Sequence, residues 1–125
     1  MVTELTMHDM QPETGLPPDN NMHVVMFYGV TCGPCKATMP HYEMASNFFN
    51  QKNAPVRFHR IHAWEEGEQK EYCANVWGIN GVPHFKVFYK GQIISIREGG
   101  GDEPTMTKFV LDAIDEVFKR FGDRL

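Results

Sequence analysis

The apolar residues of this chain fall into short runs whose spacing changes along the sequence, and those changes predict the secondary structure. The run from Val24 to Tyr28 is continuous and β-prone, which is typical of a central strand buried on both faces. Two later runs are separated only by Lys90-Gly91, which is the spacing of a tight antiparallel hairpin. The predicted strands span residues 2 to 6, 23 to 29, 56 to 63, 85 to 89 and 92 to 97.

Between and after these strands lie three segments whose residues suit helices. The first follows the turn at residues 31 to 34, runs to about residue 50, and contains Pro40, which we expect to kink it. The second, residues 65 to 76, is acidic at its start, where negative charge complements the helix dipole; we interpret its glutamates as a solvated face. The third follows Asp102 as its N-cap and continues to residue 121 along a strong apolar stripe.

The order of these elements predicts the fold class. Strand, helix, strand, helix, hairpin and helix follow one another from residue 23, which indicates an α/β domain with a central mixed β-sheet flanked by helices on both faces. We place this domain at residues 23–125. Residues 1–22 are polar and rich in proline and turn residues, so we interpret them as an N-terminal segment with a short strand and a loop.

Composition and charge exclude several classes of protein. Lys and Arg number 12 against 16 Asp and Glu, which gives a net charge of -4. This balance lacks the excess of basic residues that a nucleic-acid-binding protein needs to contact phosphates. No Lys or Arg precedes Lys36, and the longest apolar run has seven residues, so we expect neither a secretory signal nor a membrane span. The odd count of three cysteines indicates a reducing compartment, and we expect a cytoplasmic protein.

The segment Cys32-Gly33-Pro34-Cys35 lies where the predicted central strand passes into a helix. Unpaired backbone N–H groups and the positive end of the helix dipole stabilise a thiolate on Cys32 at that point. Cys35, three residues further on, lies close enough to form a disulfide and deep enough to be shielded from outside attack. Gly33 permits the tight approach, and Pro34 costs no hydrogen bond at the start of a helix. The spacing therefore predicts a redox pair in which Cys32 attacks and Cys35 resolves.

Two other interpretations of the pair are a structural zinc half-site and two incidental core cysteines. Zinc normally takes four ligands, and the chain has neither a second Cys-x-x-Cys nor a Cys-His pair at finger spacing. We therefore prefer the redox pair and expect no metal and no bound organic cofactor. The third cysteine, Cys73, lies on the second predicted helix, and we prefer a structural role for it over a thiol open to modification.

The segment from Phe27 to Lys36, with Pro40 downstream, closely resembles the active-site segment of thioredoxins. A second stretch, from Gly78 to Pro83 and on through the hairpin to Gly99, resembles the family's cis-proline region and closing hairpin. The resemblance covers roughly residues 23 to 121, with the two motifs in the family's order. It implies a thioredoxin-like fold, a protein-disulfide reductase activity and a peptide groove beside the cysteines.

The resemblance also assigns roles to single residues. Cys32 matches the attacking thiol and Cys35 the resolving thiol, while Pro83 matches the cis-proline that packs against the disulfide. Val82 matches the residue whose backbone pairs with a bound substrate strand, and Thr31 precedes the first cysteine on the substrate face. The expected partners are disulfide-containing proteins and an external reductase such as a thioredoxin reductase. We expect the chain itself to be a monomer. The alternatives are a disulfide oxidase or isomerase, and a thioredoxin-like binding module with little turnover.

Three positions depart from the family pattern. Met26 stands where the family usually has a buried acid, so the second step should be slower or use another base. Thr31 replaces the usual tryptophan and removes contact surface, and His84 follows Pro83 in place of a small polar residue. We hypothesise that His84 lies near the thiols and tunes them, against the alternative of an exposed or core histidine. The prolines before residue 22 also predict that the family's first helix is short or missing.

Overall fold

The computed structural model describes all residues, 1–125, and its centre is a five-stranded mixed β-sheet. The strands lie in the order β1-β3-β2-β4-β5, with β1, β3 and β2 parallel and β4 and β5 antiparallel to their neighbours. The strands are β1 (Val2–Leu5), β2 (Met22–Tyr28), β3 (Val56–His62), β4 (His84–Tyr89) and β5 (Gln92–Glu98).

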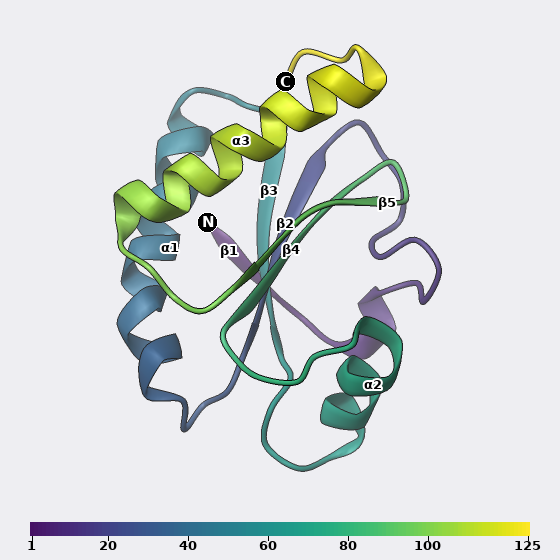
Figure 1. Cartoon of the computed structure of the whole chain (residues 1–125), viewed down its shortest axis with the longest axis vertical. Helices are drawn as coiled ribbons and strands as arrows, with labels where there is room; N and C mark the ends of the chain where they lie inside the picture. Colours follow the sequence, from purple (N-terminus) through teal and green to yellow (C-terminus); the bar gives the residue numbers. More distant parts are fainter.

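Helices cover both faces of this sheet, which confirms the predicted α/β class. Figure 1 shows α1 and α3 side by side on one face, whereas α2 and the short 3-10 helix η1 lie on the other. The helices are η1 (Met7–Asp9), α1 (Gly33–Gln51), α2 (Glu68–Trp77) and α3 (Glu103–Phe121). The sheet is therefore the middle layer of three.

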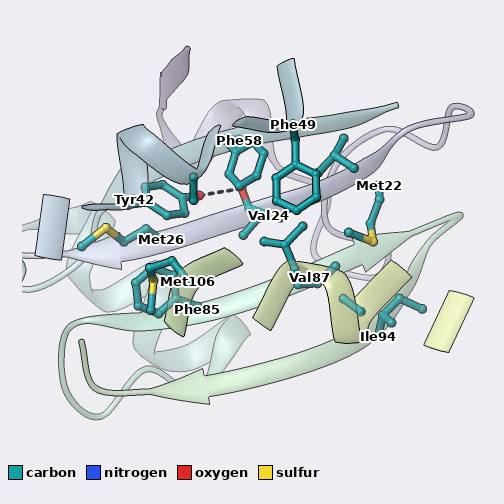
Figure 2. Packing of buried hydrophobic residues seen from close by; sticks show 14 of the residues in the cluster. Met22, Val24, Met26, Tyr42, Phe49, Phe58, Phe85, Val87, Ile94 and Met106 are labelled. Atoms are coloured by element: carbon teal, nitrogen blue, oxygen red, sulfur yellow. Dashed lines mark hydrogen bonds between the residues drawn. The ribbon is translucent and has the colours of Figure 1, made fainter. Parts of the chain in front are cut away.

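The central strand β2 is buried on both faces, as its continuous apolar run predicts. Met22, Val24 and Met26 pack in the core beneath α1 and α3, which Figure 2 shows from close by. Val25 and Phe27 point to the opposite face and pack in a second core with residues of α2. All five residues are fully buried, so β2 is shielded from solvent along its length. This buried strand fixes the position of the turn that leads into α1.

Local turn chemistry accounts for the hairpin and for the last helix. Lys90 and Gly91 both have positive φ, 47° and 79°, which is the backbone of the tight hairpin predicted between β4 and β5. Asp102 caps α3, because its carboxylate accepts a hydrogen bond from the backbone N–H of Thr105 at 3.0 Å. Both predictions are confirmed.

The first 22 residues add a strand but no α-helix before β2. The strand predicted at residues 2 to 6 is present as β1, which pairs with β3 at the edge of the sheet. The only helical turn that follows is η1, in agreement with the expectation of a short or missing first helix. Met10 and Leu16 lie buried in the core on the α2 face, so this segment covers part of the sheet.

Two predictions around residue 65 are wrong. The second helix begins at Glu68 and not at Glu65, because Gly67 has a φ of 147° and the Glu65 side chain bonds to a different part of the chain. Glu65 therefore does not belong to the solvated helix face. Next to it, Trp64 is half-buried with the Lys70 ammonium 4.9 Å from the centroid of its ring, whereas Trp77 is buried in the core on the α2 face.

Candidate active site

The two active-site cysteines lie at the N-terminal end of α1 and form a disulfide. Cys32 is the N-cap residue, and Cys35 lies in the first turn with its Cα 5.2 Å from that of Cys32. The Sγ of Cys32 accepts a hydrogen bond from the backbone N–H of Cys35 at 3.1 Å. The helix thus directs one of its unpaired N–H groups at Cys32, and this donor would stabilise a thiolate on that sulfur after reduction.

The two cysteines differ in their accessibility. Cys32 is partly exposed, whereas Cys35 has only 1% of its surface exposed. Cys35 forms part of the wall of a pocket of about 270 Å³ that Lys36 and Arg60 also line. Cys32 is therefore open to a second molecule, whereas the fold shields Cys35 from solvent. This asymmetry suits one attacking and one resolving thiol.

Val82 and Pro83 lie beside Cys32, immediately before β4. The peptide bond between them is cis, which confirms that prediction for Pro83. The carbonyl oxygen of Val82 lies 3.7 Å from the Sγ of Cys32. A hollow of about 300 Å³ runs along both residues and along Gly99. The fold therefore brings together two motifs that are 50 residues apart in the sequence.

The remaining residues of the predicted site surround Cys32 at the surface. Thr31, Gly33 and Pro34 are all exposed, and no other part of the chain lies within 4 Å of the position that a Cβ on Gly33 would take. The hydroxyl of Thr31 donates a hydrogen bond to Oε2 of Glu65 at 3.2 Å. This face is therefore open to a partner on the side of residues 31 to 34.

Glu65 is a further residue of this site, and the sequence motifs do not indicate it. Its Oε1 accepts a hydrogen bond from the Val30 backbone N–H, and the Nε2 of His62 lies 2.7 Å from the same oxygen. The only signal in the sequence is its place just after a strand. Because β2 and β3 are parallel, their carboxyl ends meet at one edge of the sheet, where Glu65 faces Val30 and Thr31.

His84 lies at the start of β4 and is buried, with 5% of its surface exposed. Its ring packs edge-on against Phe27 on the α2 face of the sheet, and its Nδ1 lies 3.9 Å from Oε1 of Glu98. Burial lowers the pKa of this imidazole. No hydrogen bond joins His84 to Cys32 or Cys35, so the tuning of the thiols by His84 stays a prediction.

The core beneath Cys35 is apolar. Met26 is fully buried there and lies in the same core as Tyr42, Phe85 and Met106 (Figure 2). None of the buried residues of the chain is an Asp or a Glu. A carboxylate that could accept the Cys35 proton from within the core is therefore not part of this site.

Cys73 lies on α2 and is completely buried in the core of that face. Burial raises the pKa of its thiol to about 12, which leaves it protonated and unreactive near neutral pH. The structural role preferred from the sequence agrees with this position.

The chain holds no group of three or more His, Cys, Asp or Glu residues that could bind a metal ion. None of its helices combines the length and the apolar character that crossing a membrane requires.

The three-layer fold and the disulfide at the start of α1 define a thioredoxin-fold protein with a disulfide-forming cysteine pair. The thioredoxin family model matches residues 6–112, so the chain belongs to the thioredoxin family. The match confirms the family and the fold that the two sequence motifs indicate.

Curated relatives of the chain include protein disulfide-isomerases. That of Drosophila melanogaster is 33% identical over 81 residues, which cover 65% of this chain and 16% of the relative. That of Humicola insolens is 32% identical over 108 residues, which cover 80% of this chain and 19% of the relative. The chain therefore spans less than a fifth of the length of these relatives.

Solved structures of thioredoxins have the same fold. The thioredoxin of Malassezia sympodialis superposes with a TM-score of 0.69 at 23% identity, covering 90% of this chain and 91% of the other. Thioredoxin F from spinach chloroplast gives a TM-score of 0.68 at 23% identity, covering 90% of this chain and 85% of the other. At this identity the likeness concerns the fold.

Proposed function

We propose that this chain is a thiol-disulfide oxidoreductase that reduces disulfides in other proteins through Cys32 and Cys35. The observation that carries the proposal is the asymmetry of the pair. Cys32 is partly exposed and receives a helix N–H, while Cys35 is buried one turn further on. A two-step exchange requires one thiol that a substrate can reach and a second thiol that is shielded from outside attack.

In the proposed cycle, the Cys32 thiolate attacks one sulfur of the target disulfide. That bond breaks, a mixed disulfide joins Cys32 to the target, and the displaced sulfur takes up a proton. Cys35 then loses its thiol proton and attacks the Sγ of Cys32. The bond from Cys32 to the target breaks, and the departing target sulfur takes up a proton, so the target leaves as a dithiol. The target gains the two electrons that the cysteine pair loses, and the chain ends in the disulfide form of this structure.

Several further parts of the proposal rest on the same site. Thr31, Val82 and Pro83 would contact the substrate. Thr31 is exposed next to Cys32, Val82 is half-buried beside its Sγ, and Pro83 is buried but lines the hollow of about 300 Å³. An external reductase such as a thioredoxin reductase would restore the dithiol. A reducing compartment, for which we propose the cytoplasm, suits a chain whose third cysteine is unpaired and buried.

Turnover of a protein disulfide with dithiothreitol as electron donor tests the proposal. We expect the wild type to turn over, Cys32→Ser to be inactive, and Cys35→Ser to turn over far more slowly, because its mixed disulfide is released only when dithiothreitol attacks it from outside. Cys73→Ala is the matched control and should keep the wild-type rate, since Cys73 is buried away from the pair. A wild type without turnover, although its disulfide is reduced and reformed reversibly, would support the binding-module alternative instead.

The second candidate is a disulfide isomerase, which the curated relatives favour by name. Both activities use the same attack by Cys32, and they differ in whether the pair is mostly reduced or mostly oxidised at the potential of its compartment. Measuring the reduction potential of the pair distinguishes them. A potential near that of reducing thioredoxins supports the reductase, and one near that of isomerases supports the second candidate.

A further inference from the structure

Glu65 connects the loop after β3 to the loop that carries Cys32, although 33 positions separate the two residues in the sequence. Oε1 accepts the backbone N–H of Val30, and Oε2 accepts the hydroxyl of Thr31 at 3.2 Å. Both partners lie within two positions of Cys32. The carboxylate thus binds the chain immediately before the N-cap of α1 through two separate hydrogen bonds.

Glu65 is itself held in place from two sides. The Nε2 of His62 lies 2.7 Å from Oε1, and this hydrogen bond is the main reason that the pKa of Glu65 is lowered. On the other side Gly29 leaves room for the carboxylate. A Cβ at that position would lie 2.8 Å from Oε2 and 2.9 Å from the Cβ of Trp64, closer than real Cβ atoms come. The site therefore requires a residue without a side chain at position 29.

We propose that Glu65 is a positioning residue for the nucleophile Cys32. By holding Val30 and Thr31, it fixes where the chain enters α1, and so keeps the Sγ of Cys32 beside the Val82 carbonyl and within reach of a docked disulfide. This inference rests on the proposed function for the chemistry that Cys32 performs. Small errors in the position of a nucleophile are costly, and a misplacement of about 1 Å can cost about a hundredfold in rate.

Two neutral variants isolate position from charge. Glu65→Gln keeps an oxygen for the Val30 N–H and an amide group that can bond to the Thr31 hydroxyl, whereas Glu65→Ala removes both contacts. Loss of the negative charge affects the two variants equally. Glu66→Ala is the matched control, because Glu66 is the exposed neighbour and is not among the residues that hold Val30 or Thr31.

The measurement is kcat/KM for reduction of a protein disulfide, together with amide hydrogen exchange at Val30. We expect Glu65→Gln to stay within about threefold of the wild type, and Glu65→Ala to fall about tenfold below Glu65→Gln with faster exchange at Val30. Glu66→Ala should match the wild type in both. Equal kcat/KM in the two Glu65 variants would overturn the proposal, because the carboxylate would then act through its charge or not at all.

A separate readout keeps this test independent of the protein substrate. The rate at which iodoacetamide alkylates Cys32 is measured in the same variants on the Cys35→Ser background. If the wild type reduces no protein disulfide, the proposed function fails. A slower alkylation in Glu65→Ala than in Glu65→Gln would still support the positioning role, and equal alkylation rates in that case would overturn it.

Discussion

At the scale of single residues, a buried pair of histidines has the clearest consequence for stability. The Nε2 of His59 and the Nδ1 of His23 are 2.9 Å apart, and the Nε2 of His23 lies 2.9 Å from a carboxylate oxygen of Asp19. If His23 donates to Asp19, then His23 accepts from His59, and both rings are neutral. The Nδ1 of His59 is buried without a hydrogen-bond partner, so a proton added there would have no acceptor.

We predict that His59 makes the protein less stable as the pH falls. Burial is the main cause that lowers the pKa of His59 from 6.5 to about 4. Between these values the unfolded chain binds a proton that the folded chain does not. The free energy of unfolding is therefore highest above pH 6.5, where His59 is neutral in both states. It falls progressively as the pH drops toward 4, by on the order of 2 to 3 kcal/mol.

Urea unfolding at pH 7 and at pH 5 checks this prediction. The free energy of unfolding of the wild type should fall between the two pH values, and His59→Gln should show a smaller fall. His8→Gln is the control, because His8 is exposed on η1 and lies outside the buried pair. An unchanged pH dependence in His59→Gln would show that other groups cause the loss.

At the scale of elements, one hydroxyl joins α1 to the two strands beneath it. The hydroxyl oxygen of Tyr42 lies 3.1 Å from the carbonyl oxygen of Val24 on β2 and 2.8 Å from that of His59 on β3. Figure 2 shows the bond to Val24 within the core. Tyr42 is only 1% exposed, so solvent cannot take the place of these two carbonyl groups as acceptors for its hydroxyl. The helix that carries both cysteines is thereby fixed against the sheet.

Tyr42→Phe should lower the free energy of unfolding by about 1 to 2 kcal/mol, because it leaves buried carbonyl groups with one donor fewer. Tyr28→Phe is the matched control. The Tyr28 hydroxyl bonds to the carboxylate of Glu4 near the surface, where water can take its place, so we expect less than about 0.5 kcal/mol there. Equal losses in the two variants would contradict the role of Tyr42.

The elements themselves could largely be predicted, because their causes are local. The apolar run of β2, the Lys90-Gly91 turn and the Asp102 cap each act within a few residues of the structure that they specify. The start of α2 could not be predicted, since it depends on bonds from Glu65 to residues more than 30 positions away. The His23 and His59 pair was missed for the same reason, since 36 positions separate its members.

The candidate site divides in the same way. The cysteine pair and the cis-proline region are local motifs, so they could be found in the sequence and given roles through the resemblance to thioredoxins. The contacts around them depend on how separate motifs meet in the fold. The position of His84 on the α2 face and the part played by Glu65 needed the structure.

At the scale of the whole molecule, the site forms where three separate parts of the chain meet. The turn into α1 brings Cys32, the loop after β3 brings Glu65, and the segment before β4 brings Val82. The sheet holds the three together, because β2 is the neighbour of both β3 and β4 (Figure 1). The central claim is that this arrangement makes Cys32 the attacking thiol and Cys35 the resolving thiol.

The most direct test of that claim is to trap the covalent intermediate. The Cys35→Ser variant is incubated with a disulfide-containing protein, and the adduct is located by mass spectrometry. The account predicts a mixed disulfide at Cys32 that dithiothreitol releases, and no adduct in a variant that also carries Cys32→Ser. An adduct at Cys73, or an adduct of equal yield when Cys32→Ser is present, would contradict the account.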